Sequence, residues 1–280
     1  MSTIPEVGVV PPGAAPWVSA AGDHRRPEGR VETTGGAFVT VTVGILYPGY
    51  SAEDDYPRLE GQLGGGVRLP LVHTLMREDA HRVDALLDVG GEDVLADGAA
   101  ALAGHAPDAV VWACTSGSFV FGWEGAHTQV EKLAAAAGVP ASSTSFAFVR
   151  AARALGVSRV AVAATYPADV AERFVEFLGR AGIRALTLTS RGIVTAAEVG
   201  TLGEDDVLDF VAANDHVDAE AVLVPDTALH TASLLDRLDE RLGKPVLTAN
   251  QVSVWEGLRL AGRTATAGLG ALSRPQPVTE

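Results

Sequence analysis

Two stretches of the chain, VGILYPGYSAEDDYPRLEGQL at 43–63 and VAVAATYPADVAERFVEFLGR at 160–180, follow the same plan. Each begins with an apolar run that ends in Tyr-Pro and continues into an acidic stretch that opens a helical pattern. Apolar runs without a polar face are typical of central parallel strands that helices cover on both sides. The repeat therefore predicts two related α/β units, each of which starts with a strand and a helix.

The same alternation of strands and helices continues along the chain. Strands are expected at 38–47, 67–72, 109–114, 159–165, 184–189, 221–225 and 245–249. Helical patterns that end in a glycine suited to a left-handed cap are found at 124–138, 145–156, 167–182 and 228–243. This repetition indicates an α/β fold with two pseudo-symmetric lobes, each a mostly parallel sheet flanked by helices.

Composition shifts divide the chain into segments. Residues 1–38 are rich in Pro, Gly and Ala without periodicity, and we expect them to form a flexible N-terminal extension. An N-terminal-type lobe is expected at 39–141 plus 246–265, a C-terminal-type lobe at 142–245, and a tail at 266–280. In such sheets ligands bind outside the carboxyl ends of the strands, so the active site is expected in the cleft between the lobes.

The overall composition narrows the kinds of partner. A chain of 280 residues with 47% hydrophobic residues can bury a large core. The net charge of -14 argues against binding to nucleic acid or to an anionic membrane, so the expected partners are a small molecule and a second copy of the chain in a homo-oligomer. Neither a membrane-spanning run nor a leader pattern is found, and we expect a cytoplasmic protein. The spacings typical of metal sites are missing, so no metal is expected.

Equivalent strands of the two halves end in reactive side chains. VVWACTSGS at 110–118 contains Cys114, the single cysteine, and AVLVPDTALH at 221–230 contains Asp226. Under the pseudo-symmetry these two residues face each other across a bound acid. Proton removal next to a carboxylate creates an enediolate, which preorganised hydrogen-bond donors stabilise. The expected donors are Thr115, Ser116, Thr227, Tyr47 and Tyr166.

Structural roles for the same residues stay open at this point. A lone cysteine at the end of a buried strand is often part of an inert core. Asp226 precedes the helical pattern at 228–243, so it fits a helix N-cap as well as a base. A helix that starts soon after Asp226 would also favour an anion through its dipole. Tyr47 and Tyr166 could serve as aromatic plugs at the strand ends.

From Val41 to Gly262 the chain resembles the aspartate/glutamate racemase superfamily, and within it the maleate cis-trans isomerase and arylmalonate decarboxylase branch. The resemblance is clearest in ASSTSFAFVRAARALGVSRVAVAATYPADVAERFVEFL (141–178) and ERLGKPVLTANQVSVWEGLRLAG (240–262). It implies two pseudo-symmetric lobes, one reactive residue from each, and neither a metal nor an organic cofactor. Cys114 matches the cysteine that adds to the double bond in maleate isomerases. Thr115, Ser116 and Tyr166 match the positions that hold the substrate carboxylate in the decarboxylase.

The chain departs from this family pattern at Asp226, where the isomerase and the decarboxylase carry cysteine. An unperturbed aspartate has a pKa of about 3.9 and a cysteine one of about 8.5, so the pair should rest as carboxylate and thiol. Reversing these states costs about 4.6 pKa units, roughly 6 kcal/mol, which disfavours free racemisation in both directions. A covalent route in which Asp226 helps to generate the Cys114 thiolate stays open.

The sequence therefore predicts a cofactor-independent isomerase or lyase. It should act at the carbon α to a carboxylate of a small organic acid, through an enediolate or a Cys114 adduct. Cys114 and Asp226 are the expected catalytic residues. Two alternatives remain, an amino-acid racemase and a non-catalytic protein that binds small carboxylates on the same scaffold.

Overall fold

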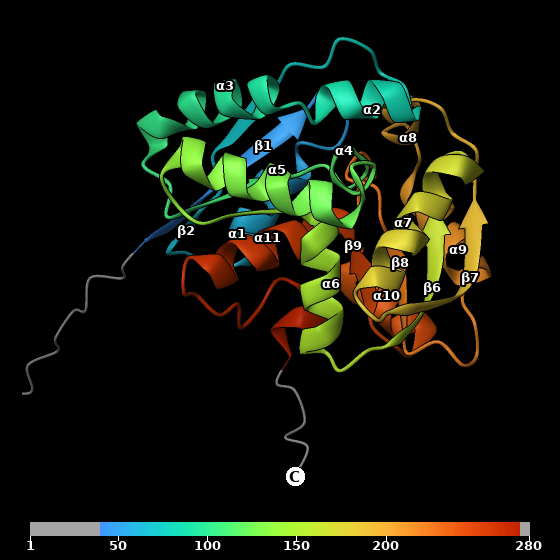
Figure 1. Cartoon of the computed structure of the whole chain (residues 1–280). Helices are drawn as coiled ribbons and strands as arrows, with labels where there is room; N and C mark the ends of the chain where they lie inside the picture. Colours follow the sequence, from blue (N-terminus) through green and yellow to red (C-terminus); the bar gives the residue numbers. More distant parts are fainter. Residues whose placement is uncertain (1–39, 275–280) are drawn as a thin grey trace, which may run out of the picture. The chain divides into compact units, whose positions relative to one another are not determined.

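The computed structural model describes residues 40–274 (Figure 1). The predicted extension at 1–38 and the last residues of the predicted tail, 275–280, lie outside the described residues. Within the described range, nine strands form two sheets in which all the strand pairs are parallel. The first sheet contains β1 (Val41–Pro48), β2 (Val67–Arg68), β3 (Leu71–Thr74), β4 (Ala109–Trp112) and β5 (Ala141–Ser143). The second contains β6 (Arg159–Ala164), β7 (Arg184–Ser190), β8 (Ala221–Val224) and β9 (Val246–Thr248).

The two sheets share one strand order. β2 and β3 are successive pieces that pair with the two ends of β1, and they are separated by Leu69 and Pro70. When β2 and β3 are counted as one strand, the strands of the first sheet lie in the order second, first, third, fourth. The second sheet, β7-β6-β8-β9, has the same order. The α/β fold with two pseudo-symmetric parallel sheets is therefore confirmed.

Helices cover both sheets, and Figure 1 shows α3 and α5 over the first sheet and α7 near the second. The helices are α1 (Asp55–Gln62), α2 (Val83–Val89), α3 (Glu92–Leu102), α4 (Ser116–Phe119), α5 (Gly122–Ala137), α6 (Thr144–Ala154), α7 (Ala168–Arg180), α8 (Ala196–Val199), α9 (Glu204–Ala213), α10 (Leu235–Leu242) and α11 (Ala249–Leu260), with 3-10 turns at Ala103–His105 and Gly270–Ser273. The predicted helix at 167–182 is confirmed as α7, whose Val170, Phe174 and Leu178 are fully buried. A four-residue spacing places these side chains on one face, which packs into the core.

The end of each sheet differs from the sequence-based expectation. β5 was not predicted, because Ala-Ser-Ser at 141–143 is short and lacks the branched residues that mark strands. β9 pairs with β8, so the strand that begins at Val246 belongs to the second sheet and not to the first lobe as predicted. The following helix, α11, packs against β4 and α6. The remaining lobe boundaries stay a prediction.

A second correction concerns the chain after Asp226. No helix starts there, because residues 225–234 form turns and α10 begins only at Leu235. Three backbone N–H groups of this segment donate to side-chain carboxylates, while those of Leu229 and Leu234 close turns onto the carbonyls of Asp226 and Thr231. Ala228 N–H donates to the Asp226 carboxylate, and the N–H groups of Thr231 and Ala232 donate to a carboxylate of α1. Such side-chain acceptors compete with helix formation.

Candidate active site

A cavity of about 30 Å³ lies at the carboxyl ends of β1, β4 and β8. Five of the predicted site residues line it, namely Tyr47, Cys114, Ser116, Asp226 and Thr227. They come from both halves of the chain, as the internal repeat predicts. A volume of this size holds little more than water, so an organic acid must widen the cavity when it enters.

The other two predicted site residues lie behind this wall. Thr115 is fully buried and Tyr166 is 1% exposed, and neither lines the cavity. Tyr166 Oη donates a hydrogen bond to the Pro225 carbonyl. Burial is the main cause that raises the pKa of the Tyr166 phenol above its ordinary value. The nearby hydroxyls of Thr115 and Ser116 oppose this rise. Their role in substrate binding stays a prediction.

Cys114 follows the last residue of β4 by two positions and precedes α4. Its thiol is 5% exposed, receives the Gly117 N–H at 3.2 Å, and lies 3.8 Å from Ser116 Oγ. Burial raises the pKa of Cys114 to about 11, and the negative charge of Asp226 adds to this rise, whereas the Gly117 and Ser116 hydrogen bonds oppose it. At neutral pH the group is therefore a protonated thiol and can serve as a proton donor.

Asp226 occupies the equivalent place after β8. Its carboxylate is 3% exposed, and both oxygens accept hydrogen bonds, Oδ1 from Ala228 N–H at 2.9 Å and Oδ2 from the Thr165 hydroxyl. An aspartate that accepts the N–H two residues ahead forms an Asx turn. The alternative in which Asp226 caps a helix is therefore wrong. The Asp226 carboxyl group is held by two donors at the cavity wall, which places it to act as a base.

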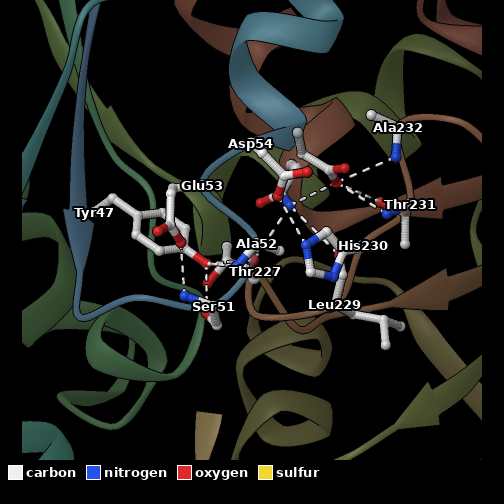
Figure 2. A network of polar contacts seen from close by, with 12 residues as sticks. Tyr47, Ser51, Ala52, Glu53, Asp54, Thr227, Leu229, His230, Thr231 and Ala232 are labelled. Atoms are coloured by element: carbon white, nitrogen blue, oxygen red, sulfur yellow. Dashed lines mark hydrogen bonds and ion pairs between the residues drawn. The ribbon is translucent and has the colours of Figure 1, made fainter. Parts of the chain in front are cut away.

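Tyr47 joins the end of β1 to the loop that contains Thr227. Its Oη donates to the Thr227 carbonyl at 3.0 Å, accepts the Ala52 N–H at 3.0 Å, and lies 2.7 Å from Ser51 Oγ (Figure 2). Burial raises the pKa of this phenol, so it stays neutral. Its ring lines the cavity, while its hydroxyl connects segments that are 180 residues apart in the chain.

A second buried carboxylate, that of Asp55, lies outside the cavity wall and binds the segment that follows Thr227. Asp55 is 2% exposed, and its Oδ2 accepts the N–H groups of Thr231 at 2.9 Å and Ala232 at 3.1 Å and the Asn250 side-chain amide at 2.9 Å. Asn250 also donates to the Thr227 carbonyl at 3.2 Å. Figure 2 shows how residues 51–54, just before α1, face residues 227–232. The sequence placed Asp55 in a first helical turn but offered no sign of these distant partners.

His81 is a further cavity residue that sequence analysis missed. It is 8% exposed, its N–H donates to the Val194 carbonyl at 2.7 Å, and its Nδ1 lies 3.0 Å from the Ile193 carbonyl. Its ring packs edge-on against Tyr166 at 5.0 Å. Since a carbonyl only accepts hydrogen bonds, Nδ1 must carry a hydrogen. Nε2 is left without a protein partner in the described part of the chain.

The segment 76–81, after β3, covers the cavity and is bound to the opposite half. The Asp79 carboxylate accepts the N–H groups of Ala196 at 2.7 Å and Ala197 at 3.0 Å, at the start of α8. Together with the bonds of His81, these contacts fix the segment at the cavity wall that also contains Cys114 and Asp226.

The described residues offer neither a metal site nor a membrane span. Over residues 40–274, no group of three or more His, Cys, Asp or Glu side chains is arranged to hold a metal ion. None of the helices in this range combines the length and the apolar character needed to cross a bilayer.

Comparison with known proteins identifies similar sequences. A family model described as arylmalonate decarboxylase matches residues 86–273. The chain is 34% identical over 140 residues to the arylmalonate decarboxylase of Bordetella bronchiseptica, which covers 48% of this chain and 57% of that protein. It is 25% identical over 126 residues to the maleate isomerase of Alcaligenes faecalis, and the match covers 44% of this chain and 49% of that protein. The chain thus spans about half the length of the curated relatives it matches.

Solved structures of similar proteins cover nearly the whole of their own chains. A double mutant of arylmalonate decarboxylase in the liganded form aligns with a TM-score of 0.74 and 26% identity, over 83% of this chain and 98% of that one. The maleate isomerase of Pseudomonas putida S16 aligns with a TM-score of 0.75 and 20% identity, over 83% and 98%. A maleate cis-trans isomerase mutant of Nocardia farcinica with a covalently bound succinylcysteine intermediate aligns with a TM-score of 0.75 and 22% identity, over 84% and 98%. The likeness to the two isomerases shows a shared fold.

Proposed function

The chain belongs to the arylmalonate decarboxylase family, and from this premise we propose that it is an isomerase or lyase acting on a small carboxylic acid at the carbon α to the carboxylate. One observation carries the proposal. Cys114 and Asp226 follow equivalent strands of the two halves, line one cavity, and lie close enough for the charge of Asp226 to act on the thiol.

The two residues have complementary roles. In a decarboxylation the bond to CO2 breaks, its electron pair forms the enediolate, and the Cys114 S–H delivers the proton to the α-carbon. In an inversion at the α-carbon Asp226 removes the α-proton and Cys114 delivers a proton to the opposite face, which leaves Asp226 protonated and Cys114 as a thiolate until exchange with water restores both. The hydroxyls of Ser116 and Thr227 lie in the same wall and are the candidate donors to the enediolate oxygens.

An enediolate route is favoured over a Cys114 adduct. With a pKa of about 11, roughly one thiol in 10⁴ is ionised at pH 7, and only the thiolate adds to a double bond. The charge of Asp226 raises the pKa of Cys114, so its charge does not promote the thiolate as the covalent hypothesis requires. Asp226 could assist that route only by accepting the proton itself.

Turnover of a substrate panel tests this proposal. Substituted malonates, maleate and α-substituted acids are incubated with the full chain in D2O, and CO2 release and deuterium incorporation are followed. Cys114→Ser should lower the rate on any accepted acid by about 10²–10⁴-fold, the usual contribution of a general acid. A control substitution, Glu124→Gln on the exposed part of α5, should leave it unchanged. Full activity of Cys114→Ser would refute the assignment.

A further inference from the structure

The active-site cavity is lined by three carboxylates and one imidazole, and the described residues in its wall include neither Lys nor Arg. These groups belong to Glu78, Asp79, Asp226 and His81. Glu78 is paired with Arg82 at 2.9 Å, on the exposed side of the covering segment. Asp79 is satisfied by two N–H groups of α8. Asp79 and Asp226 therefore both lack a Lys or Arg partner in the described part of the chain, and Asp226 is the one close enough to Cys114 for its charge to act on the thiol.

The hydrogen bonding of Asp226 decides what it can accept from a ligand. Each of its oxygens receives one protein hydrogen bond, and a carboxylate oxygen can accept two. A ligand N–H or O–H group can therefore bind there directly. A ligand carboxylate placed at the same point is a like charge in a site that is shielded from water, where repulsion is strong.

His81 offers the ligand a second hydrogen-bond acceptor. Its Nδ1 is held by the Ile193 carbonyl, and Nε2 remains for a ligand at the cavity wall. With the hydrogen on Nδ1, Nε2 of that tautomer accepts a hydrogen bond. Asp226 and Nε2 therefore both favour a donor group on the ligand, whereas a second carboxylate meets Asp226 and neither a Lys nor an Arg in the described wall.

We propose that the cavity selects a small acid with one carboxylate and one hydrogen-bond donor, an amide, amine or hydroxyl group that binds Asp226, and that it discriminates against dicarboxylates. Maleate and arylmalonates, after which the relatives are named, carry two carboxylates. The inference rests on the proposed function only in placing the substrate in this cavity.

A matched pair of ligands tests the selection. Maleate and its monoamide, maleamate, have the same carbon skeleton and differ in one carboxylate against one amide. Their binding to the full chain is measured by titration calorimetry, together with phenylmalonate and its monoamide. The dissociation constant of each monoamide should be at least about tenfold lower than that of its parent diacid. Equal or tighter binding of the diacids would overturn the inference alone, whereas failure of all four ligands to bind would overturn the proposed function and the inference with it.

Asp226→Asn provides the reciprocal test. The new amide keeps an oxygen for Ala228 N–H and presents an N–H group toward the cavity, so maleate should bind about tenfold more tightly and maleamate more weakly. Asp54→Asn, the same change at a side chain that is 63% exposed and outside the cavity wall, should leave the ratio of the two affinities unchanged. An unaltered ratio in a folded Asp226→Asn protein would contradict the inference. If that variant does not fold, the two ligand pairs on the unaltered chain decide the question.

Discussion

The ends of β4 and β8 hold their reactive side chains in similar ways and give them opposite chemistry. After β4, the Gly117 N–H reaches the sulfur of Cys114 at 3.2 Å. After β8, the Ala228 N–H reaches the carboxylate of Asp226 at 2.9 Å. In both cases a main-chain donor from the next turn fixes the side chain at the edge of one cavity.

The difference lies in where the proton rests. Burial raises the pKa of Cys114 to about 11, so the thiol keeps its proton. Asp226 is held by two hydrogen-bond donors at the cavity wall, in position to receive a proton. The repeated scaffold thus sets the positions of the two groups, while the residue types set the direction of proton transfer.

Removing either partner should have the largest effect. On an acid whose reaction begins with removal of the α-proton, Cys114→Ala and Asp226→Asn should each lower kcat by about 10²–10⁴-fold, because each removes one proton-transfer group. The double variant should be hardly slower than the slower single variant, since groups that act as a unit are not additive. Steady-state kinetics on an accepted acid provide the measurement. Losses that multiply in the double variant would contradict a coupled pair.

The next largest effect is expected on stability, from the hydrogen bonds of the buried Asp55 carboxylate, which join the first half of the chain to the second. Asp55→Ala leaves the N–H groups of Thr231 and Ala232 without their acceptor, which should cost about 3 kcal/mol in the free energy of unfolding. Asp54→Ala removes only an exposed contact to His230 and should cost less than about 1 kcal/mol. Urea denaturation of both variants measures the difference. Equal losses would show that the buried bonds do not hold the halves together.

The raised pKa of Cys114 should also appear as a pH dependence of stability. A group whose pKa rises from 9.0 to about 11 on folding stabilises the fold below pH 9, and this contribution is lost as the pH approaches 11. Over that range the unaltered chain should lose about 2 to 3 kcal/mol more than Cys114→Ser, whose hydroxyl does not titrate. Denaturation curves that run in parallel for the two proteins would disprove the shift.

A smaller effect is expected from Thr165, which positions Asp226. Thr165→Val preserves the shape of the side chain and removes the hydroxyl that donates to Asp226 Oδ2. Loss of one such bond should lower kcat by about 10- to 100-fold, in line with roughly 1.5 to 3 kcal/mol for a bond to a charged group. A loss as large as that of Asp226→Asn would mean that Thr165 does more than position the base. An unchanged pH profile of kcat/KM would likewise contradict its action through Asp226.

The fold and the centre of the site could be predicted because they depend on local patterns. The repeated strand followed by Tyr-Pro predicted two equivalent sheets, and five of the seven residues predicted around the strand ends line the cavity, while their roles stay a prediction. The turns at 225–234 were not predicted, in part because one acceptor of this segment, Asp55, lies some 176 residues before Thr231, whose N–H it accepts. His81 was missed for a similar reason, because its partners lie 112 residues away in the other half. Long-range contacts of this kind leave no periodic signal in the sequence.

The central claim, that Cys114 is a proton-holding thiol beside a carboxylate, is tested most directly by alkylation. Because Cys114 is the one cysteine of the chain, iodoacetamide reports on this thiol alone. The rate should rise with pH toward an apparent pKa of about 11, and Asp226→Asn should lower that pKa because it removes the neighbouring charge. An apparent pKa at or below about 8.5, the value of a free cysteine, or the same pKa in both proteins, would contradict the account.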